Sequence, residues 1–251
     1  MSINKFMLSL ATAGILGASS ALAETDGAFV GVQLGFGGAN TANEVCSSAG
    51  IISICNTDSK SANALRYGFL AGYKQFFTEK FGLRYYGVID FGTQSEHKIG
   101  PSFNHYGSGA SAYFNFTETI KISTLNLNAN VDALYNFEQN DSFEFGVFGG
   151  LSLGYTSYKA QSVAINGVNL TNFAYSYKDL SASGFDFGIN FGLRANIAQN
   201  HGVELYSRFG LLEKKKDITR TIVDEGATKT LNQTYKTSQP YAVGLRYSFS
   251  F

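Results

Sequence analysis

The sequence predicts an all-β protein, an eight-stranded antiparallel transmembrane β-barrel with long extracellular loops and short periplasmic turns. First, apolar residues alternate with small, polar or charged residues in eight segments, which is the period of a strand with two different faces. Second, the links between these segments are alternately short and long. Third, 28 Gly, only 2 Pro and 15% aromatic residues suit curved, closely packed strands. The formal net charge of zero gives no basic surface for nucleic acid.

Residues 1–23 predict a cleaved signal peptide, so that 24–251 form the barrel. Lys5 supplies a positive start, "FMLSLATAGILGA" an apolar core, and Ala21-Leu22-Ala23 a small-residue cleavage site. A buried helix or a membrane anchor is the alternative, but the apolar stretch is short for a span. No later run of 18 apolar residues predicts a transmembrane helix. We therefore expect an exported protein.

The third predicted strand, "FGLRYYGVIDFG" at 81–92, shows the pattern most clearly. One face is apolar, whereas the other carries Arg84 and Asp90 among glycines. The other predicted strands cover about 27–38, 64–77, 120–137, 142–158, 182–198, 202–213 and 241–251. A soluble barrel would bury its apolar face. Here that face is continuous across the strands, so we expect it to contact lipid, where only a closed sheet satisfies its backbone. Several strands exceed the ~9–11 residues needed to cross a bilayer and should project beyond it.

The links indicate the orientation. "TEK", "EQND" and "QNH" are short, whereas the four other links are long. These long links cover roughly 39–63, 95–118, 159–181 and 214–239. Outer-membrane barrels place short turns in the periplasm, and an even number of strands puts both ends of the mature chain there. "QSVAINGVNLTNF", with an Asn166-Gly167 turn, and "ITRTIVDEGATKTLNQTY" each predict a protruding hairpin.

The chain ends on "YAVGLRYSFSF", with Tyr247, Phe249 and Phe251 at alternate positions. A terminal aromatic residue on such a strand resembles the signal that the barrel-assembly machinery reads during insertion. An ordinary edge strand that ends in Phe is the alternative.

Charged residues on the inward face predict a network that fills the lumen. The six positive and five negative residues are Arg66, Lys74, Arg84, Arg194, Arg208 and Arg246, and Asp90, Asp132, Glu144, Asp186 and Glu204. Unpaired charges would be costly in a narrow interior, and eight strands leave a lumen that side chains largely fill. The alternative is an ion-selective pore, although such a pore favours a lining of one sign.

Cys46 and Cys55, the only two cysteines, predict a disulfide in the first long link. An exported protein meets an oxidising compartment, where an even pair at this spacing forms a bridge. Metal binding is disfavoured because no His lies near the pair in the sequence, and we expect no cofactor.

Catalysis has little support. His97 and His105 lie near Asp90 and several serines in the second long link, but nothing fixes their geometry. His201 falls in a short turn, the wrong end for chemistry at the outer rim. We therefore expect no enzyme. "EKKK" at 213–216 either contacts lipopolysaccharide phosphates or forms a solvated rim.

Three segments resemble the Helicobacter-type outer-membrane protein family (the Hop and Hor group). They are "DGAFVGVQLGFGG", "KFGLRYYGVIDFG" and "YAVGLRYSFSF". The resemblance covers the strands and not the loops. Larger members resemble adhesins with an extracellular domain between the first strand and the other seven. Only about 39–63 occupies that place here, so adhesion is not carried over.

These observations predict an outer-membrane protein with a structural and surface-interaction role and a charge-paired lumen. Its expected partners are outer-membrane lipid, lipopolysaccharide and the assembly machinery, with a possible host-surface ligand of unknown identity. A small, weakly conducting porin-like channel is the alternative, and a surface adhesin that acts through its loops is the third hypothesis.

Overall fold

A computed structural model describes most of the chain after the predicted signal peptide, which itself lies outside the described residues. The described ranges are 26–49, 52–99, 102–107, 110–115, 118–140, 143–165, 168–169, 181–198, 200–224 and 227–251. Within them the chain forms thirteen β-strands. No helix in this part of the chain is long and apolar enough to cross a membrane.

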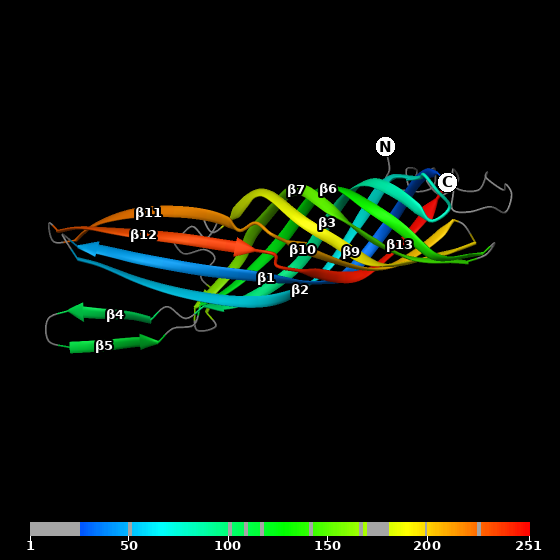
Figure 1. The fold of residues 1–251 in the computed structure, drawn as a ribbon. Helices are drawn as coiled ribbons and strands as arrows, with labels where there is room; N and C mark the ends of the chain where they lie inside the picture. Colours follow the sequence, from blue (N-terminus) through cyan, green and yellow to red (C-terminus); the bar gives the residue numbers. More distant parts are fainter. Residues whose placement is uncertain are drawn as a thin grey trace, which may run out of the picture.

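Eight of these strands close into an antiparallel barrel, which confirms the predicted fold (Figure 1). In order around the barrel they are β1 (Gly27–Ala49), β2 (Ile52–Phe76), β3 (Phe81–Ile99), β6 (Glu118–Asn140), β7 (Phe143–Ile165), β9 (Ala182–Ile197), β10 (His201–Gly210) and β13 (Ala242–Ser250). Strand β1 pairs with both β2 and β13 and so closes the sheet. Closure leaves no open edge in the barrel wall, as a membrane-spanning sheet requires.

The two ends of the barrel differ. The start of β1, the end of β13 and the short link 77–80 between β2 and β3 lie at one end (Figure 1). At that end the Phe251 N–H donates to the Ala28 carbonyl oxygen at 2.9 Å, and the Phe76 N–H donates to an Asp26 carboxylate oxygen at 2.6 Å. The opposite end carries the long segments.

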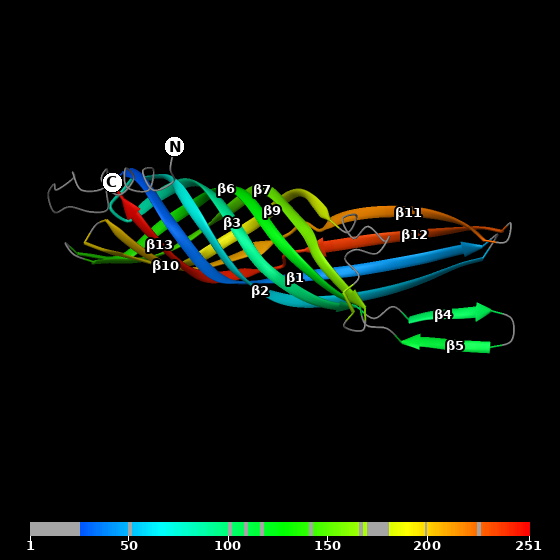
Figure 2. The same cartoon turned by 180° about the vertical axis from the view of Figure 1, so that it is seen from behind.

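Two of the predicted long links are in fact extended strands. Strands β1 and β2 stay paired up to Ala49 opposite Ile52, across the predicted link 39–63. Strands β11 (Lys214–Asp224) and β12 (Ala227–Ser238) form the predicted second hairpin, and β12 pairs with β1 from Asn40 to Ser48. The result is a four-stranded sheet beyond the barrel, in the order β11-β12-β1-β2 (Figure 2). We call this sheet the blade: strands β11 and β12 with residues 40–49 and 52–61.

The other two long links contain shorter elements. Strands β4 (Ser102–Gly107) and β5 (Ala110–Asn115) form a separate two-stranded sheet. Strand β8 (Val168–Asn169) pairs with the end of β7, with Ile165 opposite Val168. This pairing flanks the predicted turn at 166–167, whose two residues lie outside the described ranges.

The barrel wall divides where the blade begins. Pairing between β2 and β3 ends at Arg66 opposite Gly92, and pairing between β9 and β10 ends at Gly188 opposite Gly210. Beyond these points the blade stands on one side, and β3, β6 and β7 continue as a second sheet on the other.

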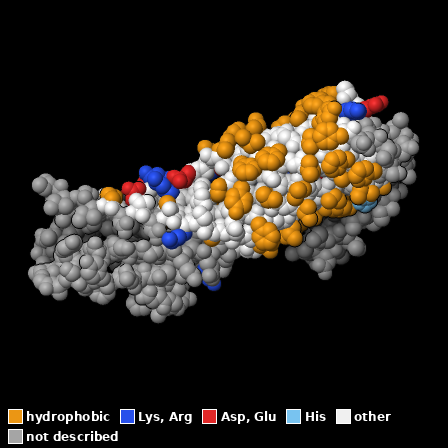
Figure 3. All heavy atoms as spheres, turned by 60° about the horizontal axis from the view of Figure 1, so that its bottom comes forward, with side chains coloured by type: hydrophobic (Ala, Val, Ile, Leu, Met, Phe, Trp, Pro, Cys, Tyr) orange, Lys and Arg blue, Asp and Glu red, His pale blue; other side chains and the backbone are white. Residues whose placement is uncertain are grey.

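The two faces of the barrel have opposite chemistry. Apolar side chains cover the visible outer surface (Figure 3), and Phe36, Phe185 and Leu245 are 62%, 74% and 59% exposed. Inside, the strands bury polar and charged residues instead, and Asp132 is 0% exposed. A water-soluble protein rarely exposes so large an apolar surface, so the band that surrounds the barrel is the lipid-facing one.

Glycines on the two faces should respond differently to substitution. A Cβ atom at Gly150 would overlap the Val131 carbonyl oxygen and the Asp132 side chain, whereas one at Gly87 would meet no atom within 4 Å. We expect Gly150→Ala to lower the free energy of unfolding by roughly 2–3 kcal/mol, because backbone must move to admit the methyl group. Gly87→Ala is the matched control and should change it by less than about 0.5 kcal/mol. Urea unfolding followed by the different gel migration of boiled and unboiled samples measures both; equal midpoints would contradict the assigned faces.

Candidate functional site

All eleven predicted lumen charges lie inside the barrel, each no more than 7% exposed. They are Arg66, Lys74, Arg84, Asp90, Asp132, Glu144, Asp186, Arg194, Glu204, Arg208 and Arg246. They point inward because alternate residues of a strand face the same side. The lumen is therefore the richest concentration of chemistry in the described part of the chain.

The central cluster is built around Asp132 on β6. Its Oδ2 accepts hydrogen bonds from the Arg84 Nε and Nη2 at 3.1 and 2.9 Å and from the Tyr86 hydroxyl at 2.8 Å. Asn190 Nδ2 donates to Oδ1 at 3.3 Å. The Arg84 Nη1 forms an ion pair with Glu204, which comes from β10. One arginine thus neutralises two carboxylates that come from different strands.

A second arginine joins this cluster to the rest of the lumen. Arg246 Nη1 donates to the Tyr86 hydroxyl at 3.1 Å, and its guanidinium lies over the Tyr206 ring at 4.2 Å. Its Nε donates to Gln33 Oε1 at 3.0 Å, while Gln33 Nε2 donates to Asp90 Oδ2 at 2.7 Å. Gln33 therefore links two charged clusters. The charge pattern missed it because it is neutral, although its inward position on the first strand was visible in the alternation.

The outer cluster lies towards the blade. Arg66 Nη2 is 2.7 Å from Asp90 Oδ1. Asp186 receives two cations, with Arg208 Nη2 at 2.7 Å and Lys214 Nζ at 2.9 Å. Neither the solvated rim nor the lipopolysaccharide contact proposed for "EKKK" holds for Lys214, which is only 4% exposed. Its even numbering, shared with the inward residues of β10, was the signal that could have placed it.

The third cluster lies towards the short links. Arg194 Nη1 donates to Asn136 Oδ1 at 3.1 Å, and Asn196 Nδ2 donates to Glu144 Oε2 at 3.0 Å. Lys74 is buried at 5% exposure. With Lys214 the six predicted cations become seven, against five anions, so the described lumen carries two more positive than negative side chains.

Little space remains between these clusters. A cavity of about 10 Å³ lies among Gln33, Asp90, Asn128, Tyr206 and Arg246. Such a volume holds about one water molecule. Side chains therefore fill the lumen at this level.

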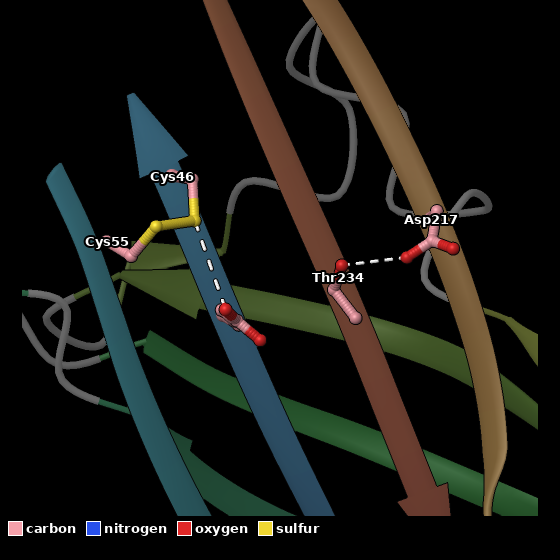
Figure 4. Close-up of a disulfide and its surroundings, with 5 residues drawn as sticks. Cys46, Cys55, Asp217 and Thr234 are labelled. Atoms are coloured by element: carbon pink, nitrogen blue, oxygen red, sulfur yellow. Dashed lines mark hydrogen bonds between the residues drawn. A yellow bond between two sulfur atoms is a disulfide. The ribbon is translucent and has the colours of Figure 1, made fainter. Parts of the chain in front are cut away.

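The blade carries the predicted disulfide, which the structure confirms (Figure 4). Cys46 and Cys55 are direct partners in the β1–β2 pairing and are separated by nine positions in the chain. The Glu44 carboxylate lies near both sulfur atoms, but disulfide sulfurs are not thiolates and do not bind metal as thiolates do. The bridge ties β1 to β2, and closing a loop of this length is worth roughly 2.7 kcal/mol in the chain-entropy model.

A polar pair lies on the neighbouring hairpin of the blade. The Thr234 hydroxyl donates to Asp217 Oδ1 at 2.7 Å (Figure 4). This hydrogen bond holds the pKa of the Asp217 carboxyl below its ordinary value. Lys215 Nζ lies 3.2 Å from Asp217 Oδ2. Asp217 is therefore a fixed negative charge on an exposed surface.

The predicted assembly residues lie on the last strand and at the chain end. Tyr247 and Phe251 are 42% and 51% exposed on the outer surface. The Phe249 ring packs against the rings of Phe251 and His201, each with centroids 5.4 Å apart. His201 Nδ1 is 2.7 Å from the Tyr247 hydroxyl oxygen, at the end with the short links. The side chains of His97 and His105 lie outside the described residues, so the structure does not place that hypothetical catalytic pair.

Removing Asp132 should be far costlier than removing an exposed aspartate. We expect Asp132→Ala to lower the free energy of unfolding by about 3–5 kcal/mol, because it leaves Arg84 buried with one fewer anion. Asp217→Ala, which removes an exposed carboxylate with a similar hydrogen bond, is the control and should shift the urea midpoint only slightly. If both variants unfolded at the wild-type midpoint, the central cluster would not stabilise the barrel.

Comparisons with solved structures find outer-membrane barrels of low sequence identity. The outer membrane protein OprG from Pseudomonas aeruginosa is 12% identical, with 92% of this chain and 99% of that chain covered and a TM-score of 0.43. Neisserial surface protein A is also 12% identical, with coverage of 86% and 97% and a TM-score of 0.36. Ail, the attachment invasion locus protein of Yersinia pestis, is 11% identical, with coverage of 88% and 98% and a TM-score of 0.29. No curated protein matches the chain.

The family comparison is decisive. The model of the Helicobacter outer membrane protein family matches residues 68–251, well over half of the chain. That range begins within β2 and includes the six barrel strands that follow it. It also contains two of the three segments whose resemblance to the family was noted in the sequence. The chain belongs to the Helicobacter outer membrane protein family.

Proposed function

We propose that this outer-membrane barrel acts as a structural and surface-interaction protein whose lumen is closed by paired charges. In this proposal it is neither an enzyme nor an open pore. Its partners are the surrounding lipid and lipopolysaccharide, and the assembly machinery during insertion.

The lumen network carries the proposal. From Arg66 the contacts run through Asp90 and Gln33 to Arg246, and from there through Tyr86 to Asp132. A continuous ion path would require these contacts to separate. Because each separated buried charge costs several kcal/mol, the closed arrangement is strongly favoured over an open one.

The asymmetry of the barrel supports an orientation. Short links and the two ends of the barrel chain lie at one end, and the blade lies at the other. Outer-membrane barrels keep short turns in the periplasm. We infer that the blade faces the outside of the cell and that both mature termini are periplasmic.

Two other functions are supported by specific observations. The polar lining and the excess of two cations favour a weakly conducting, anion-preferring channel as the alternative. The projecting blade, with its disulfide, favours a surface adhesin as the third hypothesis. An adhesin would lose its host ligand on deletion of blade residues but not on mutation of lumen charges.

Planar-bilayer recording separates the closed barrel from the channel. We expect refolded wild-type protein to show no reproducible unitary conductance, because paired side chains fill the lumen. Lys80→Ala, in the exposed short link 77–80, removes a cation outside the lumen and should stay silent as well. Regular unitary steps from wild-type protein, above all with anion selectivity, would establish the channel instead.

Deletion of the terminal residue tests the assembly signal. We expect removal of Phe251 to lower the amount of heat-modifiable barrel in the outer-membrane fraction several-fold, because its exposed aromatic ring and its backbone contact with Ala28 would both be lost. Phe251→Tyr keeps an aromatic ring and the backbone, and should assemble normally. Normal assembly of the deletion variant would show that the terminal aromatic is not the signal.

A further inference from the structure

Two lysines face each other on the outward side of the blade. Lys215 on β11 is the direct register partner of Lys236 on β12. Their neighbours in each strand, Lys214 and Tyr235, are buried on the inward side, so Lys215 and Lys236 point outward. Like charges directly opposite one another in a sheet repel.

The surrounding residues only partly neutralise this pair. Lys215 contacts Asp217 at 3.2 Å, and Thr234 holds the other carboxylate oxygen. Lys236 forms no ion pair within the described ranges. One carboxylate is thus shared by two ammonium groups. Lys216, also exposed, adds a third positive charge, and the exposed Glu213 a second negative one, so the group keeps a net charge of +1.

The position of the pair relative to the apolar band suggests its partner. Leu211, Leu212 and Tyr241 are 54%, 44% and 36% exposed and form the edge of the band on this flank. Lys215 follows Leu211 by four residues, which is about 13 Å along an extended strand. Lys and Arg side chains lie beyond the end of the apolar surface in Figure 3. Because lysine stems lie along apolar surface while the ammonium stays in polar surroundings, these groups reach the depth of lipid headgroups.

We propose that Lys215 and Lys236 together bind a phosphate group of an outer-leaflet glycolipid, that is, of lipopolysaccharide. Asp217, fixed by Thr234, holds Lys215 beside Lys236, so that the two ammonium groups converge on one anion. A lipid-anchored phosphate is the source that fits, because the bilayer holds it at this depth, whereas free phosphate meets two exposed, salt-screened lysines. This inference rests on the proposed orientation, with the blade on the outside.

Binding to phosphorylated and dephosphorylated lipopolysaccharide tests the proposal. Full-length wild-type protein, in phosphatidylcholine vesicles that contain either form, should bind the phosphorylated form roughly tenfold more tightly. The variant K215Q/K236Q should lose most of this difference, since each lysine near an anionic surface contributes about fivefold. The control K80Q removes a lysine from the opposite end of the barrel and should keep the preference. Heat-modifiable migration checks that each variant is folded.

Three results would overturn the proposal. Equal binding of both lipid forms by the wild type would remove the phosphate, and an unchanged preference in K215Q/K236Q would remove the lysines. Competition by low-millimolar inorganic phosphate would assign the site to a soluble anion. None of these outcomes bears on the lumen, since both lysines lie outside it. Conversely, conductance through the wild-type barrel would overturn the closed lumen and leave the lipid site intact.

Discussion

The pairing of Arg84 with Asp132 and Glu204 depends on a closed sheet, and most of the structure follows from that requirement. The three groups come from β3, β6 and β10 and meet inside the barrel. None of them could face hydrocarbon, and none could be buried alone without a large cost. The sheet must therefore bring all three strands round a common axis. The apolar alternate residues of the same strands are then left on the outside, where only lipid can cover them.

The same pairing explains why small residues face inward. The guanidinium groups of Arg84 and Arg246 lie over the rings of Phe148 and Tyr206 at 4.6 and 4.2 Å. Such large side chains fit into a narrow lumen only if their neighbours are small, and Gly150 has no room for a methyl group. The polar core of this barrel is thus packed as tightly as an apolar core, with ion pairs and stacked rings in place of aliphatic contacts.

The sequence predicted the part of the fold that lies in the membrane and failed where the strands leave it. Within the band one face is apolar, so the two-residue period is visible, and Arg84 and Asp90 were assigned inward from it. In the blade both faces are polar: Thr41 is buried and Ser59 exposed, but neither contrasts with its neighbours. The period cannot be read there, and strand-forming residues were interpreted as loops.

The charged residues of the lumen were found for the same reason, but their partners were not. The alternation gives the side of the sheet on which a residue lies and not which strand faces it across the lumen. The neutral link Gln33 and the extra cation Lys214 follow from the register and closure of the barrel. No local pattern in the sequence shows that Asp186 is shared by two cations.

The disulfide has a consequence for the evolution of such barrels. Residues 49 and 52 are paired at the tip of the blade, and the bridge between Cys46 and Cys55 lies just below them. A domain inserted between these positions would be attached to two strands that are already joined covalently. Its motions and its folding would be isolated from the barrel by the bridge and by the paired strands beneath it. The blade is in this sense a mounting stalk, on which new surface modules can be gained or lost while the membrane-embedded part stays unchanged.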